Sequence, residues 1–297
     1  GYYEQQGSLA QQMMIMAQEL GLSQYYNKPL YIQYLAYLKD LIRLDFGVSL
    51  SYFPVPVSRI LLNVLPWTLL LIYPSIIASF FIGNILGRYA ALGRGKPRDY
   101  AVLGITMFLY TFPLFVLGEI LIEYLAIDLK LFPIGSAYNT AVFPKPELTW
   151  PFITNVLYHA ALPWTVLILF NLAGWAMGMR NNMIPLLQED FMNYYRLMGV
   201  PEGIVSQRAY RVAILPNFTS FAISMGYAII GTTAIEILFN YGGVGYFWSL
   251  ALSALDYPLL NGIFFIFITI LVISNFIADM VYGIIDPRTS HEETEGL

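Results

Sequence analysis

Five long apolar runs occupy most of the chain, and none of them contains a lysine or an arginine. They cover residues 60–87, 101–126, 153–179, 213–239 and 259–285. Each is longer than the ~20 residues that a helix needs to cross a hydrocarbon layer of ~30 Å, and tilting can absorb the surplus length. Five such runs in one chain indicate an all-α, polytopic membrane protein rather than buried helices of a large soluble one.

The composition supports this interpretation. Hydrophobic residues make up 58% of the 297 residues and charged residues only 11%. Soluble domains carry roughly 25% charged residues, so this chain has too few to cover a water-facing surface of its size. The absence of cysteine, with two histidines, removes thiol chemistry, and we expect no metal site and no catalytic site. The net charge of −4 argues against binding to nucleic acid.

The basic residues predict the orientation of the spans. They concentrate in segments 88–100 and 180–212, whereas segment 127–152 has two lysines and segment 240–258 has no basic residue. The positive-inside rule places the two basic segments in the cytoplasm. The chain would then begin outside the cell, so we expect a sixth, first transmembrane helix to precede residue 1.

This orientation divides the chain into three parts. Residues 1–56 are predicted to form an extracytoplasmic segment with short amphipathic helices, over 9–20 and 30–41. Residues 57–290 form the transmembrane domain, and residues 291–297 form an acidic cytoplasmic tail.

The cytoplasmic segment 181–212 has the pattern of a docking loop. Pro185 is suited to the first turn of a helix, which Gly199 would end. A second helix would start at Pro201. A membrane protein that keeps two helical pieces around a central glycine in a cytoplasmic loop is expected to bind a partner there.

At these residues the chain resembles the B-type permease subunits of dipeptide and oligopeptide ABC importers. The family's cytoplasmic EAA loop is similar to the stretch from Glu189 to Pro201, closing on Pro216. The resemblance continues through Glu236 to Gly245, through Asp256-Tyr257-Pro258, and to the end of the last span. It covers the chain from about residue 20, although Tyr195 stands where the family has a small residue.

The resemblance implies a six-span type I ABC importer fold and several partners. These are a second homologous permease, two cytoplasmic ATPases, an external substrate-binding protein and the lipid membrane. ATP and Mg²⁺ would bind to the ATPases, and this chain would bind no cofactor. Its Gly95-Lys96 pair is followed by Pro97 and is not a phosphate-binding loop, so we expect a transport subunit and not an enzyme.

Two sets of site residues follow. The first is predicted to contact the ATPase and comprises Glu189, Asp190, Phe191, Tyr194, Tyr195, Met198, Gly199, Val200 and Pro201. The competing interpretation of Glu189 and Asp190 is that their negative charges stabilise the helix by lying at the positive end of its dipole. The second set contains candidates for the pathway or its gate, which are Glu236, Asn171, Asn275, Gly242, Gly243 and Gly245. For Glu236, a structural hydrogen bond that braces the external loop is the competing interpretation, and for the glycines a tight surface turn.

Other functions and substrates remain open. A secondary transporter would favour paired broken helices, internal repeats and charges near the membrane midplane. An intramembrane enzyme, such as a protease, would need a Ser/His pair, two aspartates in apposed spans or a metal motif. The sequence shows neither pattern. Within the importer interpretation, peptides are the first expectation for the substrate and oligosaccharides the second.

Overall fold

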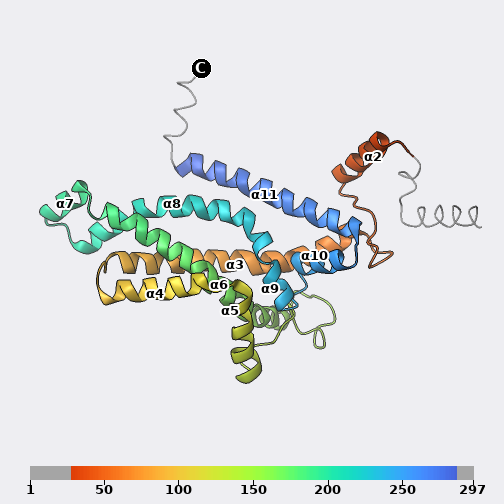
Figure 1. Cartoon of the computed structure of the whole chain (residues 1–297), viewed down its shortest axis with the longest axis horizontal. Coiled ribbons are helices and arrows are strands. Elements are labelled where there is room, and N and C mark those ends of the chain that lie inside the picture. Colours follow the sequence, from red (N-terminus) through yellow and green to blue (C-terminus); the bar gives the residue numbers. More distant parts are fainter. Residues whose placement is uncertain (1–27, 286–297) are drawn as a thin grey trace, which may run out of the picture.

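The computed structural model describes residues 28–285, whose regular elements are helices (Figure 1). The elements are α2 (Leu30–Ile42), α3 (Val57–Ala91), α4 (Pro97–Thr111), α5 (Leu114–Leu121), the π-helix η1 (Ile122–Asp128), α6 (Trp150–Leu186), α7 (Asp190–Leu197), α8 (Glu202–Gly231), α9 (Thr233–Leu238), α10 (Val244–Ser253) and α11 (Tyr257–Ile285). The amphipathic helix expected over 9–20 and the acidic tail at 291–297 lie outside the described residues.

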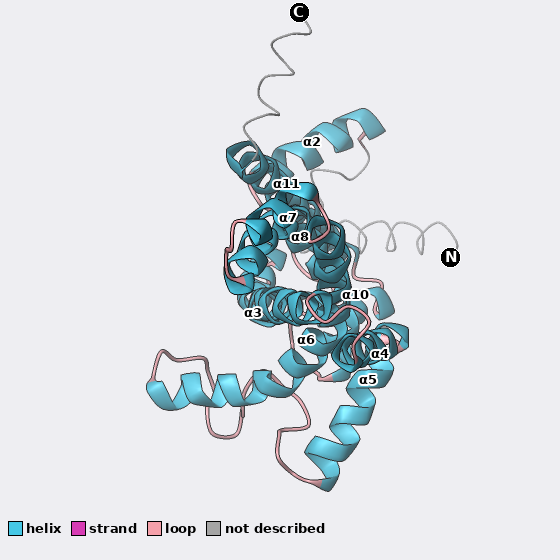
Figure 2. Cartoon of the chain, turned by 90° about the vertical axis from the view of Figure 1, so that its left-hand side faces the viewer, coloured by secondary structure: helices cyan, strands magenta, loops and turns pink. Residues whose placement is uncertain are grey.

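The long helices run side by side, with α11, α8, α3 and α4 following one another across the molecule (Figures 1 and 2). The most extensive contact joins α3 to α6. Gly83 and Gly87 of α3 permit it, because a Cβ on Gly87 would lie 2.7 Å from Met179 Cβ and closer still to the Ala176 carbonyl oxygen. Small residues one turn apart allow membrane helices to approach in this way.

Three helices of the described part are long and apolar enough to cross a membrane. They are α3, α6 and the Tyr257–Ile277 part of α11, and a fourth crossing is reached if the bent pair α4 and α5–η1 counts as one span. The structure therefore shows an all-helical protein with three to four candidate spans, where the sequence predicted five.

The run 101–126 is not the continuous helix that its composition predicted. It breaks between α4 and α5 with a bend of 100°, and α5–η1 leaves the bundle as an arm (Figure 1). Pro113 explains the break, since its ring disfavours helical backbone at the preceding residue. Phe112 accordingly has ψ 130°. The run 213–239 is likewise divided, at Thr232, into α8 and α9.

The prediction that Pro185 starts the helix of the docking loop is wrong. Pro185 lies in the last turn of α6, and the separate helix α7 begins at Asp190. A proline removes one backbone hydrogen bond but does not have to begin or end a helix, and α6 also runs through Pro163. The connection between α6 and α8 covers residues 187–201, and Gly199 lies just beyond α7 as expected.

Outside the bundle, α2 confirms the helix expected over 30–41. It projects beside the amino-terminal end of α11 (Figure 1), and none of its residues is buried. Residues 43–56, which we call the strap, connect α2 to α3. The strap contacts the bundle at Ser49, whose side chain is fully buried.

Candidate functional site

The helix α7 stands at the end of the bundle where the long helices α6 and α8 meet (Figure 1). Met192 anchors it, since this side chain is fully buried among Met179 and Met183 of α6 and Val205 of α8. Buried apolar area of this kind is the main attractive term in helix packing. The position of α7 is thus fixed by the chain's own core.

The end of α7 is closed by a glycine in left-handed conformation. Gly199 has φ +78°, its N–H donates to the Arg196 carbonyl at 3.0 Å, and the Val200 N–H donates to the Tyr195 carbonyl at 3.1 Å. This is the Schellman arrangement, which turns the chain sharply out of a helix. It leads directly to Pro201, which caps α8.

Arg196 ties the three helices of this end together. Its Nε donates to Glu202 Oε1 of α8 at 2.8 Å, and its Nη1 donates to the Leu187 carbonyl at 3.1 Å and to Asn193 Oδ1 at 2.9 Å. Because guanidinium donors have a fixed geometry, these bonds set α7 relative to α6 and α8.

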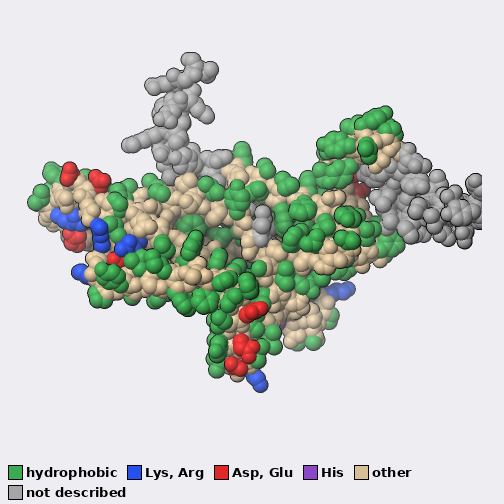
Figure 3. Space-filling model, viewed as in Figure 1, with side chains coloured by type: hydrophobic (Ala, Val, Ile, Leu, Met, Phe, Trp, Pro, Cys, Tyr) green, Lys and Arg blue, Asp and Glu red, His purple; other side chains and the backbone are tan. Residues whose placement is uncertain are grey.

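The opposite face of α7 presents large apolar side chains to the surroundings. Four are exposed, and they are Leu197 (86%), Tyr194 (61%), Met198 (52%) and Phe191 (46%). Exposed apolar side chains that gather on one rigid element mark interaction surfaces. Charged residues lie around them at this end of the molecule (Figure 3). We call these four side chains the α7 face.

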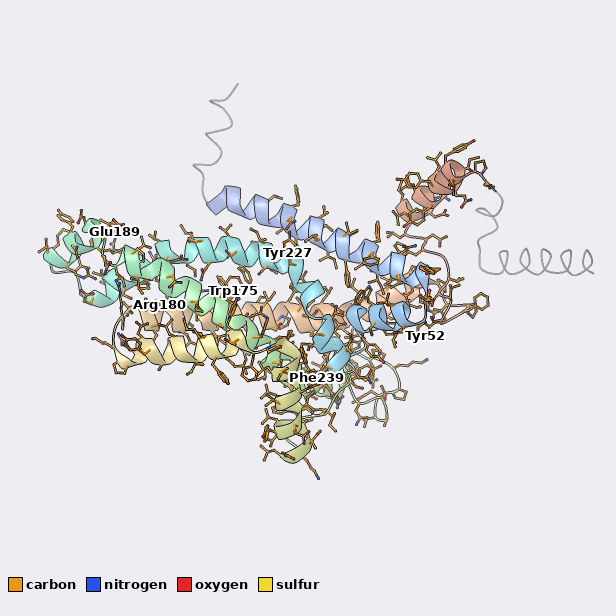
Figure 4. All side chains as sticks on the ribbon, viewed as in Figure 1. Tyr52, Trp175, Arg180, Glu189, Tyr227 and Phe239 are labelled. Carbon is orange, nitrogen blue, oxygen red and sulfur yellow. The ribbon has the colours of Figure 1, made fainter. Side chains whose placement is uncertain are left out.

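The other predicted docking residues have different positions. Glu189 is the N-cap of α7, Asp190 is its first residue, and both are exposed (Glu189 is labelled in Figure 4). Tyr195 and Val200 are half-buried against the cluster of Met192. Tyr195 lies beneath Arg208, whose Cζ is 4.7 Å from the ring centroid and whose Nη1 donates to the Tyr195 hydroxyl at 3.1 Å.

Leu197 was missed by the sequence analysis, although it is the most exposed side chain of the α7 face. Helical spacing could have predicted its position, because Leu197 follows Tyr194 by three residues and the two therefore share a face of the helix.

Several basic side chains lie at the same end of the bundle as α7. Arg88 of α3 donates to Ser206 Oγ of α8 at 3.0 Å. Arg180 of α6 holds Asp99 of α4 through two bonds, of 2.6 and 2.9 Å. These contacts show that α3, α4, α6 and α8 converge where the two basic segments of the sequence meet.

At the other end, Glu236 of α9 has a fully buried side chain that is the centre of a hydrogen-bond network. Its Oε1 accepts from the Thr68 hydroxyl of α3 at 2.7 Å, and its Oε2 accepts from the Tyr246 N–H at 3.1 Å. Thr68 Oγ1 also accepts from the Val244 N–H at 2.7 Å. Glu236 thus connects α3, α9 and the start of α10.

The glycines beside this network serve close approach and chain reversal. A Cβ on Gly243 would lie 2.5 Å from Glu236 Oε2 and 2.5 Å from Thr68 Oγ1. A Cβ on Gly245 would lie 2.6 Å from Thr233 Oγ1. Gly242 has φ +67°, which favours glycine. Their geometry is that of a packed turn that holds Glu236.

The two asparagine candidates do not share one site. Asn171 of α6 lines a cavity of ≈230 Å³ between α3, α5, α6 and α8. Asn275 lies half-buried in α11, outside the lining of that cavity. Glu236 does not line it either.

Comparison with known proteins gives one consistent result. Residues 83–291 match the family described as Binding-protein-dependent transport system inner membrane component. The oligopeptide transport system permease protein AppB of Bacillus subtilis is 31% identical over 266 residues, which cover 89% of this chain and 82% of AppB. The dipeptide transport system permease protein DppB of the same organism is 30% identical over 275 residues, covering 92% of this chain and 84% of DppB. Its Escherichia coli K12 namesake is 27% identical over 290 residues, covering 93% and 84%.

The matched region contains α4 to α11, and therefore both α7 and Glu236. The apolar helices agree with the assignment of this chain as a multi-pass transport subunit and not an enzyme. The folded loop at residues 187–201, which Met192 anchors in the core of the chain, agrees with it too. The chain belongs to the family of inner membrane components of binding-protein-dependent transport systems.

Proposed function

We propose that this chain is the permease subunit of an ATP-driven importer of dipeptides or oligopeptides. The observation that carries the proposal is its similarity, over nearly its whole length, to permeases named for dipeptide and oligopeptide transport. In such a system a binding protein delivers the substrate from outside, and a second permease completes the pore.

The α7 face supports a cytoplasmic ATPase as the partner at the basic end. It places four apolar side chains on a helix that Met192 and Arg196 hold in one orientation. Aromatic and other large apolar side chains on a rigid element make strong contacts with a matching groove. The convergence of basic residues at this end supports its assignment to the cytoplasm.

The finer count of membrane crossings is part of the proposal. We assign five to the described helices, which are α3, α4 with α5, α6, α8 with α9, and α11. The length of α8 and its contact with α11 support the fourth of these. Residues 28–56 would then lie outside the cell, and Glu236 would lie near the outer end of the fourth crossing.

The substrate is tested by mass spectrometry of the ligand that remains on the binding protein when it is purified with this permease. Peptides are the expected result. Glycans would contradict the peptide assignment and show an oligosaccharide importer on the same scaffold.

The docking assignment is tested with Gly199→Trp. A side chain at φ +78° is strained even though no atom lies within 4 Å of an added Cβ, so the exit from α7 should be displaced. We expect the variant to insert in the membrane but to lose either the ATPase subunits or the coupling of ATP hydrolysis to uptake. Normal uptake would exclude this loop as the coupling element.

A further inference from the structure

The cavity between α3, α5, α6 and α8 combines an apolar wall with neutral polar groups. Its polar side chains are Ser75, Asn171, Ser224, Tyr227 and Thr232, and Figure 4 shows Tyr227 towards the carboxyl-terminal end of α8. Among the described residues that line it, no aspartate, glutamate, lysine, arginine or histidine is present. The cavity can therefore offer hydrogen bonds without a formal charge.

Several polar side chains of this lining already donate a hydrogen bond to a carbonyl of their own helix. Ser75 donates its hydroxyl hydrogen to the Ile72 carbonyl at 2.8 Å, and Ser224 donates to the Phe221 carbonyl at 2.8 Å. A serine whose single donor is used retains two lone pairs as acceptors. Asn171 also uses one of its N–H groups on its own helix, at 2.8 Å from the Leu167 carbonyl, and keeps its amide oxygen. The second N–H of Asn171 and the Tyr227 hydroxyl remain as donors. The free acceptor lone pairs of the two serines and of the asparagine oxygen outnumber them.

Such a lining suits a ligand group that donates several hydrogen bonds and disfavours one that only accepts them. An ammonium group has three donors and no acceptor, whereas a carboxylate has acceptors alone. We infer that this cavity is a transit site for the amino-terminal ammonium group of the peptide. The inference rests on the proposed peptide transport and adds which end of the substrate this subunit contacts.

The described residues of the lining include no carboxylate, which fits passage of the ammonium group better than its storage. A buried carboxylate would attract an ammonium strongly and slow its release. Conduction requires contacts that are favourable enough for entry and weak enough for exit, as rings of neutral carbonyl oxygens provide in cation channels. Neutral serine and asparagine oxygens meet both requirements.

The cysteine-free chain allows a direct test by thiol labelling of the complete complex in vesicles. Ser75→Cys places one thiol in the cavity. Ser79→Cys is the matched control, because Ser79 lies one turn further along α3, is equally buried and makes the same kind of bond, to the Ile76 carbonyl, outside the cavity. Each variant is treated with cationic aminoethyl methanethiosulfonate and with anionic sulfonatoethyl methanethiosulfonate. Labelling is followed by the mass of this chain, and rates are divided by those of a free thiol in solution.

We expect the Ser75→Cys thiol to react about tenfold faster with the cationic reagent, equivalent to ~1.4 kcal/mol of preference. Binding protein loaded with a peptide that has a free amino terminus, supplied with ATP, should protect the thiol. Ser79→Cys should react with neither reagent. The transit site would be overturned if the Ser75→Cys thiol reacted equally with both reagents, faster with the anionic one, or not at all. The same cation preference at Ser79→Cys would also overturn it.

Uptake of a labelled peptide by the unsubstituted complex, in the same vesicles, separates the two proposals. If the peptide enters but the cation preference is absent, only the transit site is rejected. If no peptide enters, the proposed function fails and the transit site with it.

Discussion

The Thr68 hydroxyl of α3 donates a hydrogen bond of 2.7 Å to the Glu236 carboxylate of α9, and 168 positions of sequence separate the two residues. Both side chains are fully buried. Thr68 also accepts from the Val244 N–H, so this one hydroxyl joins the long helix α3 to both sides of the turn at residues 239–243. The network supports the bracing interpretation of Glu236, which the sequence analysis had set beside a role in the pathway.

Thr68→Val is therefore expected to destabilise the end of the bundle where α3, α9 and α10 meet. The valine keeps the shape but leaves a Glu236 oxygen and the Val244 N–H without their partner, and an unsatisfied buried polar group costs ~1–3 kcal/mol. We expect a lower thermal midpoint of the purified complex and faster proteolysis at residues 239–243. Thr68→Ser should restore both.

The control for this variant is Thr106→Val. Thr106 is also buried, but its hydroxyl donates only to carbonyls of its own helix, those of Val102 and Leu103. An equal loss of stability in the two variants would show that the Thr68–Glu236 bond has no special importance.

The contact between α3 and α6 gives a second prediction. An alanine Cβ at Gly87 would meet Met179 Cβ at 2.7 Å and the Ala176 carbonyl, which is backbone and cannot move aside alone. Forcing extra atoms into such a contact costs ~1–3 kcal/mol. Gly87→Ala should lower the thermal midpoint and the yield of folded complex in detergent.

Gly174→Ala in α6 is the matched control, because nothing lies within 4 Å of an added Cβ there. Alanine is the better helix former by about 0.5–1 kcal/mol, so this variant should be neutral or slightly more stable. A Gly87→Ala protein as stable as Gly174→Ala would show that α3 and α6 are not closely packed.

Local sequence signals predicted the helices well but not their interruptions or partners. The helical character of all five apolar runs is confirmed, because long apolar stretches in lipid must satisfy their backbone internally. Pro113 explains the break, since the residue before it avoids helical backbone. The proline alone could not predict the break, because α3 runs through Pro66 and Pro74 without one. Composition alone predicted one continuous helix over residues 101–126, and that prediction was wrong.

The contacts between distant segments could not be read from the sequence. Ser49 and Asp256 both lie within the part of the chain that the family resemblance covers, yet 207 positions separate the two bonded residues. No local pattern specifies such a pairing, because it depends on how the strap and α11 pack. Leu197 is a different case, since helical spacing alone would have assigned it to the α7 face.

Asp256 provides a prediction about acid. It is buried, and its carboxylate accepts from the Ser49 hydroxyl, from the Ser51 N–H at 2.9 Å and from the Leu259 N–H at 3.2 Å. Burial alone would raise the pKa of Asp256, but these hydrogen bonds outweigh burial and hold the pKa below its ordinary value of 3.8. A lowered folded-state pKa means that the stabilisation is present above pH ~4 and is lost as the pH falls through the folded-state pKa.

Asp256→Asn should therefore release the strap at neutral pH and remove part of its acid sensitivity. We expect faster proteolysis within residues 45–52 at pH ~7, by a factor equivalent to ~1–3 kcal/mol, and a smaller further increase on acidification than in the unsubstituted protein. Asp45→Asn is the control, because Asp45 is exposed and accepts a local bond from the Gly47 N–H. Equal acid profiles for the unsubstituted protein and Asp256→Asn would refute the assignment.

The α7 face gives the last prediction. Leu197 is 86% exposed, so Leu197→Glu should leave the permease folded, yet it would place a charge in the centre of an apolar contact with the ATPase. Losing a central contact costs ~2 kcal/mol or more, which is over tenfold in affinity. The measurement is binding-protein-stimulated ATP hydrolysis, titrated with added ATPase subunits. Leu148→Glu is the control, because Leu148 is 98% exposed on the loop before α6 and should behave as the unsubstituted protein. If both variants retain full stimulation, the ATPase does not bind the α7 face, and the self-anchored loop must be explained by another partner.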